Sequence, residues 1–165
     1  MDFVIELMAP EDWEQVRVIY EEGIRAGNAT FETSAPSWEQ WDKAHLPFCR
    51  LVARNRGAVV GWAALSPVSA RKAYAGVAEV SLYVSEKARG KGVGTALQEE
   101  LNGQSEGHGI WTLQGVVFPE NTASLALLKR SGFREVGRRE RISQIVGRWR
   151  DTILLERRSL VVGKD

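Results

Sequence analysis

A strand that runs into a glycine-rich turn and then into a helix constrains this chain more than any other segment. Residues 78–84 alternate at a period of two, which is typical of a strand with one buried face. Glycine then stands at every second position over 90–94, and the apolar residues that follow keep the spacing of an amphipathic helix. We therefore expect a strand, a tight turn and a helix N-terminus in direct succession.

Such a turn favours an anionic guest. The first amides of a helix lack partners within it and, together with the positive end of the helix dipole, they converge on one point. Glycine lets the backbone come close to a ligand because it has no Cβ. The neighbouring Arg89 and Lys91 add positive charge. The sequence therefore predicts a phosphate or pyrophosphate site over residues 90–95.

Two well-known phosphate-binding motifs do not fit this run. A Walker loop needs a longer spacing between its first glycine and a Gly-Lys-Ser/Thr group. A dinucleotide-binding fingerprint would begin at Gly90 and Gly92, but Thr95 occupies the place of its third glycine. That fingerprint also opens the first strand–helix unit, whereas this turn lies past the middle of the chain.

A third pattern does fit. The run Arg89-Gly90-Lys91-Gly92-Val93-Gly94 matches Arg/Gln-x-x-Gly-x-Gly/Ala and resembles the acetyl-CoA pyrophosphate loop of the GNAT (GCN5-related N-acetyltransferase) superfamily. Taken alone, so short a pattern is equally compatible with an ordinary glycine-rich turn. Further along, residues 121–133 resemble the later motif of the same superfamily, Asn-x-x-Ala/Ser, a helix and then Gly-Phe.

The second motif also has a plainer interpretation. Asn121 would serve as a helix N-cap, and Ser124 would then be a solvated residue of the first turn. Two motifs in the right order nevertheless favour the superfamily, in which this asparagine and serine contact the cofactor.

The resemblance extends to one branch of the superfamily. Segments 29–33, 73–74, 78–84 and 147–151 are similar to those of the phosphinothricin and methionine sulfoximine N-acetyltransferases, and the similarity runs from Ile5 to Leu160. It implies the GNAT fold, an α/β (α+β) architecture with a mixed, twisted, mostly antiparallel sheet and helices on both faces. It also implies acetyl-CoA as co-substrate and a homodimer with pockets near the subunit interface.

The periodicity of the whole chain predicts the element order β-α-α-β-β-β-α-β-α-β-β. Strands are expected over residues 3–7, 51–54, 59–65, 78–84, 110–118, 133–138 and 149–155. Helices are expected after Pro10, Ser37, Gly92 and Asn121. The first should end at Gly27, and the second should begin with a capping box at Ser37 and hold Trp41 and Leu46.

Bulk properties argue against several other classes. A length of 165 residues suits one domain, expected over 1–165, and a net charge of +1 gives no case for nucleic acid or an anionic membrane surface. Cys49 is the only cysteine, and His45 and His108 lack ligand spacing, so we expect no disulfide and no metal. Neither a signal-peptide pattern nor a membrane-spanning apolar stretch is present, so we expect a cytoplasmic protein.

Acetyl transfer to an amine requires a neutral acceptor nitrogen, a polarised thioester carbonyl and a stabilised leaving thiolate. Glu79 is the leading candidate for the general base, because it points away from Ala78 and Val80 and because the resembling branch has a glutamate there. The alternative is a solvent-facing strand residue. Glu32, in the presumed substrate loop, is a second carboxylate for which acceptor binding, base chemistry and no role all remain open.

The resemblance also implies the cofactor contacts. Backbone groups of Leu82, Tyr83 and Val84 are expected to bind the pantetheine arm as an added strand would and to supply an oxyanion donor. The other expected cofactor residues are Arg89, Gly90, Lys91, Gly92, Val93, Gly94, Thr95, Asn121 and Ser124. Many superfamily members carry a tyrosine that protonates the thiolate where this chain has Leu128. Water or the proton of the amine itself are then the remaining acids.

Acceptor contacts are expected at Arg71 and Tyr74, in the segment before the Glu79 strand. An arginine there would pair with an α-carboxylate, and the alternative is a solvated basic loop. Phe31 and Trp149 either wall the pocket or belong to the core, and for Trp149 the core is the favoured interpretation.

The leading hypothesis is an acetyl-CoA-dependent N-acetyltransferase that acts on the amino group of a small amino acid or analogue, such as phosphinothricin or methionine sulfoximine. One alternative is an enzyme that acetylates protein N-termini or lysines. The other is a non-catalytic acyl-CoA-binding regulator, which the presence of Glu79 argues against and Leu128 leaves open.

Overall fold

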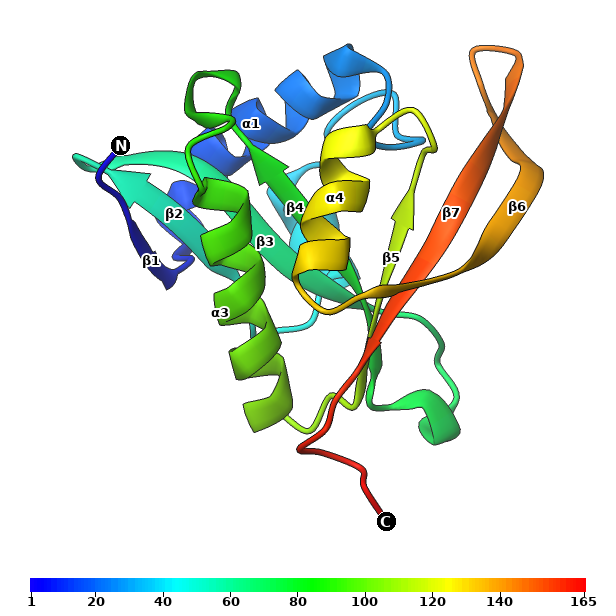
Figure 1. Cartoon of the computed structure of the whole chain (residues 1–165). Coiled ribbons are helices and arrows are strands. Elements are labelled where there is room, and N and C mark those ends of the chain that lie inside the picture. The colour runs from blue at the N-terminus through cyan, green and yellow to red at the C-terminus, as the bar shows by residue number, and fades with distance from the viewer.

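The computed structural model describes residues 1–165, built around one seven-stranded sheet (Figure 1). The strands lie in the order β1-β2-β3-β4-β5-β7-β6, and every neighbouring pair is antiparallel except β4 and β5. Their bounds are β1 Val4–Leu7, β2 Leu51–Asn55, β3 Ala58–Pro67, β4 Val77–Val84, β5 Thr112–Val117, β6 Arg134–Ile145 and β7 Arg148–Arg158. The expected mixed, mostly antiparallel sheet is confirmed.

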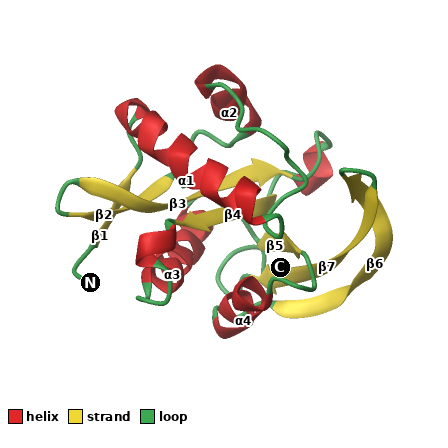
Figure 2. Cartoon of the chain, turned by 90° about the horizontal axis from the view of Figure 1, so that it is seen from above, coloured by secondary structure: helices red, strands yellow, loops and turns green.

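Helices cover both faces of the sheet, as expected (Figure 2). One face carries α1 (Trp13–Ala26) and α2 (Trp38–Ala44), and the other carries α3 (Val93–Gly107) and α4 (Thr122–Arg130). Three short 3-10 turns complete the chain, namely η1 Pro10–Asp12, η2 Lys72–Tyr74 and η3 Glu86–Ala88. The expected order of strands and α-helices is confirmed. None of the helices is both long and apolar enough to span a membrane.

Two hydrophobic clusters hold these layers together. The larger one, between the sheet and α3 with α4, is mostly aliphatic and includes the fully buried Leu97, Leu101 and Leu155. The smaller one, beneath α1 and α2, is aromatic and contains Trp13, Trp41, Trp62 and Tyr20. Each large side chain that is fully buried contributes roughly 1.5–3 kcal/mol relative to exposure, so the two clusters fix both helix layers on the sheet.

The second helix begins as expected but ends earlier. Gln40 N donates to Ser37 Oγ at 3.2 Å, and Ser37 N donates to Gln40 Oε1 at 3.0 Å, so the capping box is confirmed. The helix ends at Ala44, and the expectation that it holds Leu46 is wrong. Leu46 precedes Pro47, which disfavours helical backbone, and its amide donates instead to Leu65 O in β3 at 2.8 Å.

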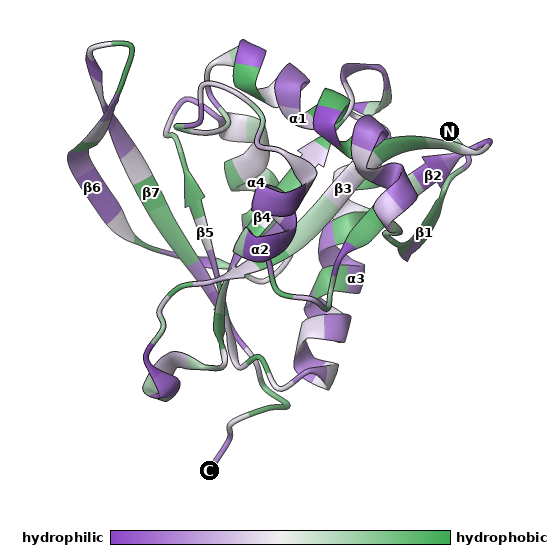
Figure 3. Ribbon diagram, turned by 180° about the vertical axis from the view of Figure 1, so that it is seen from behind, coloured by the Kyte–Doolittle hydropathy of each residue, from purple (hydrophilic) through white to green (hydrophobic).

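The β6–β7 hairpin is longer than expected and projects beyond the end of β5 (Figure 1). Its far half lacks period-two alternation in sequence, and β6 is drawn largely as hydrophilic in Figure 3. The turn at Val146 and Gly147 has positive φ at both residues, which matches the right-handed twist of a hairpin. Trp149 lies on this projecting part with 58% of its surface exposed, so its expected place in the core is wrong.

Strands β4 and β5 separate soon after they meet. Only Val77–Glu79 pair with Thr112–Gln114, after which β4 continues to Val84 without a partner on that side. The backbone groups of β4 on that side have no strand partner, and among them only Val84 O is engaged, by Arg89 Nε at 3.3 Å, so the others can bind a ligand. Two cavities lie at this divergence.

Candidate active site where two strands diverge

The first cavity, which we call the inner cavity, has a volume of about 410 Å³ and lies against β4, β5 and α4. Of its 23 lining residues 12 are hydrophobic, and two carboxylates, Glu32 and Glu79, reach it. No arginine or lysine lines it. A concave site that combines apolar walls with a few convergent polar groups is the usual form of a small-molecule pocket.

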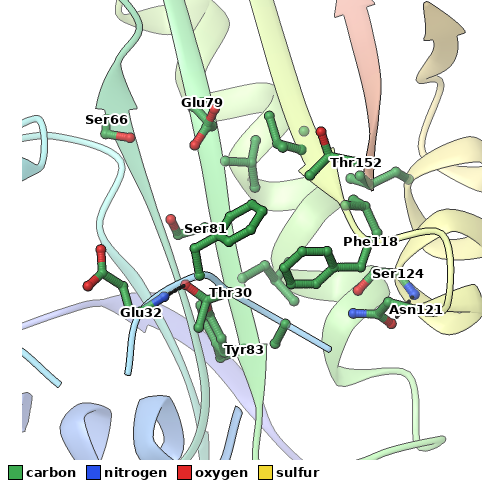
Figure 4. A pocket seen from close by; sticks show the side chains of 18 of the residues that line it. Thr30, Glu32, Ser66, Glu79, Ser81, Tyr83, Phe118, Asn121, Ser124 and Thr152 are labelled. Atoms are coloured by element: carbon green, nitrogen blue, oxygen red, sulfur yellow. Dashed lines mark hydrogen bonds between the residues drawn. The ribbon is translucent and has the colours of Figure 1, made fainter. Parts of the chain in front are cut away.

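Glu79 is placed by its strand at the centre of the sheet. It is in register with Ser66 on β3 and with Gln114 on β5. Its Oε1 accepts a hydrogen bond from Gln114 Nε2 at 2.9 Å, while Oε2 has no partner within the chain. Figure 4 shows the carboxylate among the side chains that line the inner cavity. Glu79 is therefore oriented and half-buried, and one of its oxygens is free to accept a proton.

The side chains of Ser81 and Tyr83 follow Glu79 on the same face of β4 (Figure 4). Burial raises the pKa of Tyr83, as do the neighbouring Tyr20 and Glu32, and burial likewise raises the pKa of Tyr20. Both phenols thus remain protonated at neutral pH and can donate hydrogen bonds. Sequence reasoning gave Tyr83 a backbone role only. The period of two, which puts residue 83 on the face of residue 79, would have placed its side chain in the pocket.

The loop after α1 covers the inner cavity. Thr30, Phe31 and Glu32 all line it, and Glu32 N donates to Thr30 Oγ1 at 3.1 Å. The ring of Phe31 packs edge-on against Phe118 at 4.9 Å between centroids. Phe31 and Glu32 therefore both lie at the inner cavity.

His45 also lines the inner cavity, and sequence reasoning missed it as a site residue. Its Nδ1 lies 2.7 Å from Trp41 O, and its ring stacks on Trp41 at 4.2 Å. A carbonyl oxygen can only accept, so Nδ1 carries the proton and Nε2 keeps its lone pair. Burial lowers the pKa of His45, and the charge of Arg50 lowers it further.

The second cavity, which we call the loop cavity, has a volume of about 610 Å³ and lies between the end of β4, the glycine turn and α4. Gly90 and Gly92 have φ of 71° and 85°, and Gly92 is the N-cap of α3. Such angles strain any other residue, and a Cβ at either position would meet no atom within 4 Å. The turn therefore leaves open space in front of the free first amides of α3.

The basic residues of the turn are arranged less simply than expected. Arg89 lines the loop cavity, and its Nε donates to Val84 O at 3.3 Å. Lys91 does not line it, because its Nζ donates to Lys87 O at 2.8 Å. Arg130, on α4, does line it and was missed from sequence. The cavity nevertheless has two arginines at its wall, which suits an anionic guest.

The two cavities adjoin. Six residues line both of them, namely Ala29, Leu82, Tyr83, Asn121, Ser124 and Leu127. Asn121 Oδ1 accepts a hydrogen bond from Ser124 N at 3.2 Å, so the capping role of Asn121 is confirmed. Its Nδ2 donates to Asn28 O at 3.1 Å, which ties the start of α4 to the loop after α1. An extended ligand in the loop cavity can thus reach Glu79 past these shared residues.

One expected pair of acceptor-binding residues remains apart from the cavities. Arg71 and Tyr74, at the η2 turn, line neither one, and the Arg71 guanidinium lies 5.6 Å from the centroid of the Tyr74 ring. Leu128 does line the inner cavity, where it packs against Gly115. It is apolar, so its side chain cannot protonate a thiolate.

The fold is that of an acyltransferase family. The chain belongs to the acetyltransferase (GNAT) family, whose profile matches residues 13–133. It is 32% identical to a phosphinothricin N-acetyltransferase of Alcaligenes faecalis over 93% of this chain and 81% of that protein.

Solved structures agree with this assignment. A phosphinothricin acetyltransferase of Sinorhizobium meliloti, crystallised with acetyl-CoA, superposes with a TM-score of 0.86 and 31% identity over 96% of this chain and 89% of that one. A ribosomal-protein-alanine N-acetyltransferase of Brucella melitensis superposes with a TM-score of 0.87 and 27% identity over 94% and 99% of the two chains. The chain is therefore an N-acetyltransferase of the phosphinothricin-type branch, and the family and fold expected from sequence are confirmed.

Proposed function

We propose that this enzyme transfers the acetyl group of acetyl-CoA to the amino group of a small amino acid or analogue, with Glu79 as the general base. The observation that carries the proposal is the junction of the two cavities at the unpaired part of β4. The glycine turn at the N-terminus of α3 lies at one end of this path and an oriented carboxylate at the other.

The residues present fit acetyl-CoA. The open space at Gly90 and Gly92, the first amides of α3 and the two arginines would hold the diphosphate. The free backbone edge of β4 at Leu82–Val84 would pair with the amides of the pantetheine arm. When bound, acetyl-CoA supplies an activated acetyl thioester at the entrance of the inner cavity.

Glu79 would take the proton of the acceptor ammonium, directly or through one water, so that a neutral nitrogen attacks the thioester carbonyl. The hydrogen bond from Gln114 fixes Oε1 and leaves Oε2 for this proton. A backbone amide of β4 would stabilise the oxyanion as the N–C bond forms and before the C–S bond breaks. With Leu128 in place of an acid, the thiolate would take its proton from water or from the attacking nitrogen.

Recognition of an amino-acid carboxylate would need a cation, and the lining of the inner cavity offers no arginine or lysine. Arg71 is the proposed partner, although it lies outside the cavity. A cytoplasmic homodimer, in which a second copy completes the acceptor site, would reconcile these positions. The exposed apolar side chains of the β6–β7 hairpin support such an interface, namely Val136, Ile142, Val146 and Trp149.

A second candidate is acetylation of a protein N-terminus. The inner cavity is lined by two carboxylates and by no arginine or lysine, and this favours a peptide acceptor, which has no carboxylate next to its amine. The similarity to a ribosomal-protein-alanine acetyltransferase is consistent with it.

Thiol release from acetyl-CoA separates the two candidates. The acceptors are methionine sulfoximine, phosphinothricin, their carboxamides and an alanine-initiated peptide. The proposal predicts turnover with the free amino acids and little with the carboxamides or the peptide. Faster turnover of the peptide would establish the second candidate, and no thiol release with any acceptor would refute both.

A further inference from the structure

The loop that covers the inner cavity has little structure of its own. We define it as residues 27–33 and call it the roof loop; it lies between α1 and the segment that leads to α2. It has no helix or strand, and the one hydrogen bond that a side chain makes within it joins Glu32 N and Thr30 Oγ1. Its position must therefore depend on groups outside the loop.

Arg150, on β7, supplies two of these contacts, beside the hydrogen bond from Asn121 Nδ2 to Asn28 O. Its Nη1 donates to Gly27 O at 3.1 Å, and its Nη2 donates to Asn28 Oδ1 at 2.8 Å. The same Nη2 lies 3.3 Å from Glu120 Oε2, and the guanidinium stacks on the Phe118 ring at 4.2 Å. Only 15% of the Arg150 side chain is exposed, although it lies on the projecting part of the hairpin, beyond the last pair of β5 with β7.

Arg150 contacts the start of the roof loop directly and its later part only through the Phe118 ring. At the start of the loop it holds Gly27 and Asn28 directly. Further on, Phe31 packs against the same Phe118 ring that Arg150 stacks upon. Glu120 balances the positive charge from the other side.

These contacts require an arginine. A guanidinium presents several donors in a fixed planar fork and stacks on aromatic rings, whereas a lysine ammonium is a single point with no plane. Arg150 does not line the inner cavity, so it cannot touch the acceptor there.

We propose that Arg150 is a positioning residue that holds the roof loop over the inner cavity and thereby sets acceptor affinity. Thr30, Phe31 and Glu32 face the cavity from this loop, so a loop that drifts would misplace all three at once. The anchoring of the loop by Arg150 is independent of the proposed function. The effect on acceptor affinity rests on the proposed function.

The test compares Arg150→Met, which keeps most of the side-chain length but has no donors, with Arg150→Lys, which keeps the charge without the fork. Arg134→Met is the matched control, because Arg134 lies on the same hairpin and pairs only with Glu156. Amide hydrogen exchange of the ligand-free proteins reports on the loop without any need for activity. Steady-state kinetics with acetyl-CoA and methionine sulfoximine report on the site.

In Arg150→Met and Arg150→Lys, exchange over residues 27–33 should accelerate at least about tenfold while exchange in β3 and α3 stays unchanged. The Michaelis constant for methionine sulfoximine should rise on the order of tenfold, since a small misplacement of positioning groups is costly. The Michaelis constant for acetyl-CoA and kcat should change little, and Arg134→Met should match the unsubstituted protein in every measurement.

Unchanged exchange over residues 27–33 in Arg150→Met would overturn the proposal. So would an Arg150→Lys variant that behaves like the unsubstituted protein, or a uniform rise of exchange across the whole chain. Equal losses of affinity for both substrates would also overturn it. Combining Arg150→Met with Asn28→Ala gives a further check. The two residues are partners in one contact, so the effects of the two substitutions on exchange should be markedly non-additive. If no acceptor is acetylated, the proposed function fails and the exchange data still decide whether Arg150 anchors the loop.

Discussion

The carboxylate of Glu79 and the side-chain amide of Gln114 meet at 2.9 Å across the only parallel strand pair of the sheet. These two strands diverge immediately afterwards, so the hydrogen bond lies at the closed end of the gap between them. The carboxylate is thus fixed at the point where the acceptor amine and the thioester would have to meet. The predictions below test this arrangement and the groups around it.

Glu79→Gln keeps the shape of the side chain but cannot accept a proton. Turnover should fall by on the order of a hundredfold or more, while acetyl-CoA affinity holds. Higher pH should restore part of the rate, because more of the acceptor amine is already neutral. Rate measurements from pH 6 to 10 check this, and Glu32→Gln serves as the parallel variant. If Glu79→Gln is as active as the unsubstituted enzyme at every pH, Glu32 becomes the next candidate for the base.

Gly92→Val should abolish binding of acetyl-CoA, because a side chain would project into the open space before α3. Gly57 is a matched control, since its φ of 86° is nearly equal and a Cβ there also meets nothing within 4 Å. Both valine variants should lose stability by about 1–2 kcal/mol or more through backbone strain. Only Gly57→Val should keep the rise in melting temperature with acetyl-CoA. A normal rise in Gly92→Val would show that the diphosphate binds elsewhere.

Arg71→Ala tests the proposed carboxylate partner. The Michaelis constant for an amino-acid acceptor should rise by about tenfold or more, which corresponds to loss of a charge-assisted bond of roughly 1.5–3 kcal/mol. The matching carboxamide should show no such penalty, and the neighbouring Lys72→Ala should behave as a neutral control. Equal effects on both acceptors would mean that Arg71 shapes the η2 turn and does not bind substrate.

His45 should make stability depend on pH in the acidic range. Burial lowers its pKa in the folded protein below the value near 6.5 of an unfolded histidine. As the pH falls below about 6.5, the unfolded state therefore binds more protons, and the free energy of unfolding decreases. Urea unfolding at pH 7.5, 6 and 5 should show this loss, and His45→Gln should reduce it. His108→Gln, measured alongside, separates the contribution of the other imidazole. The same slope in His45→Gln and the unsubstituted protein would contradict the prediction.

Local patterns were enough to predict most of the fold. The glycine turn, the capping box at Ser37 and the period-two strands depend on residues close together in sequence, and the structure places each of them as expected. The β6–β7 hairpin was underestimated because β6 has no buried face, so the hydrophobic alternation that marks a strand is missing there.

The site was only partly predictable for a related reason. Glu79 and Tyr83 lie on the same strand, four positions apart, and the period of two puts them on the same face of that strand. His45 reaches the pocket because Leu46 joins β3, and Arg150 meets Gly27 across 123 positions of sequence. Contacts of this kind depend on how separate elements pack, and no local pattern encodes them.

The gap beside β4 has a consequence for aggregation. An open strand edge at the rim of a sheet invites pairing with a strand of another chain, but this one lies inside the sheet, with β5 and α4 beside it. The gap between β4 and β5 narrows until the two strands pair at Glu79. A polypeptide strand that entered it could not form a regular ladder of hydrogen bonds with both neighbours. A narrow, flexible chain with only a few amide groups can enter it from the open end. The fold therefore keeps a hydrogen-bonding edge permanently exposed to a thin ligand while protecting it from other proteins.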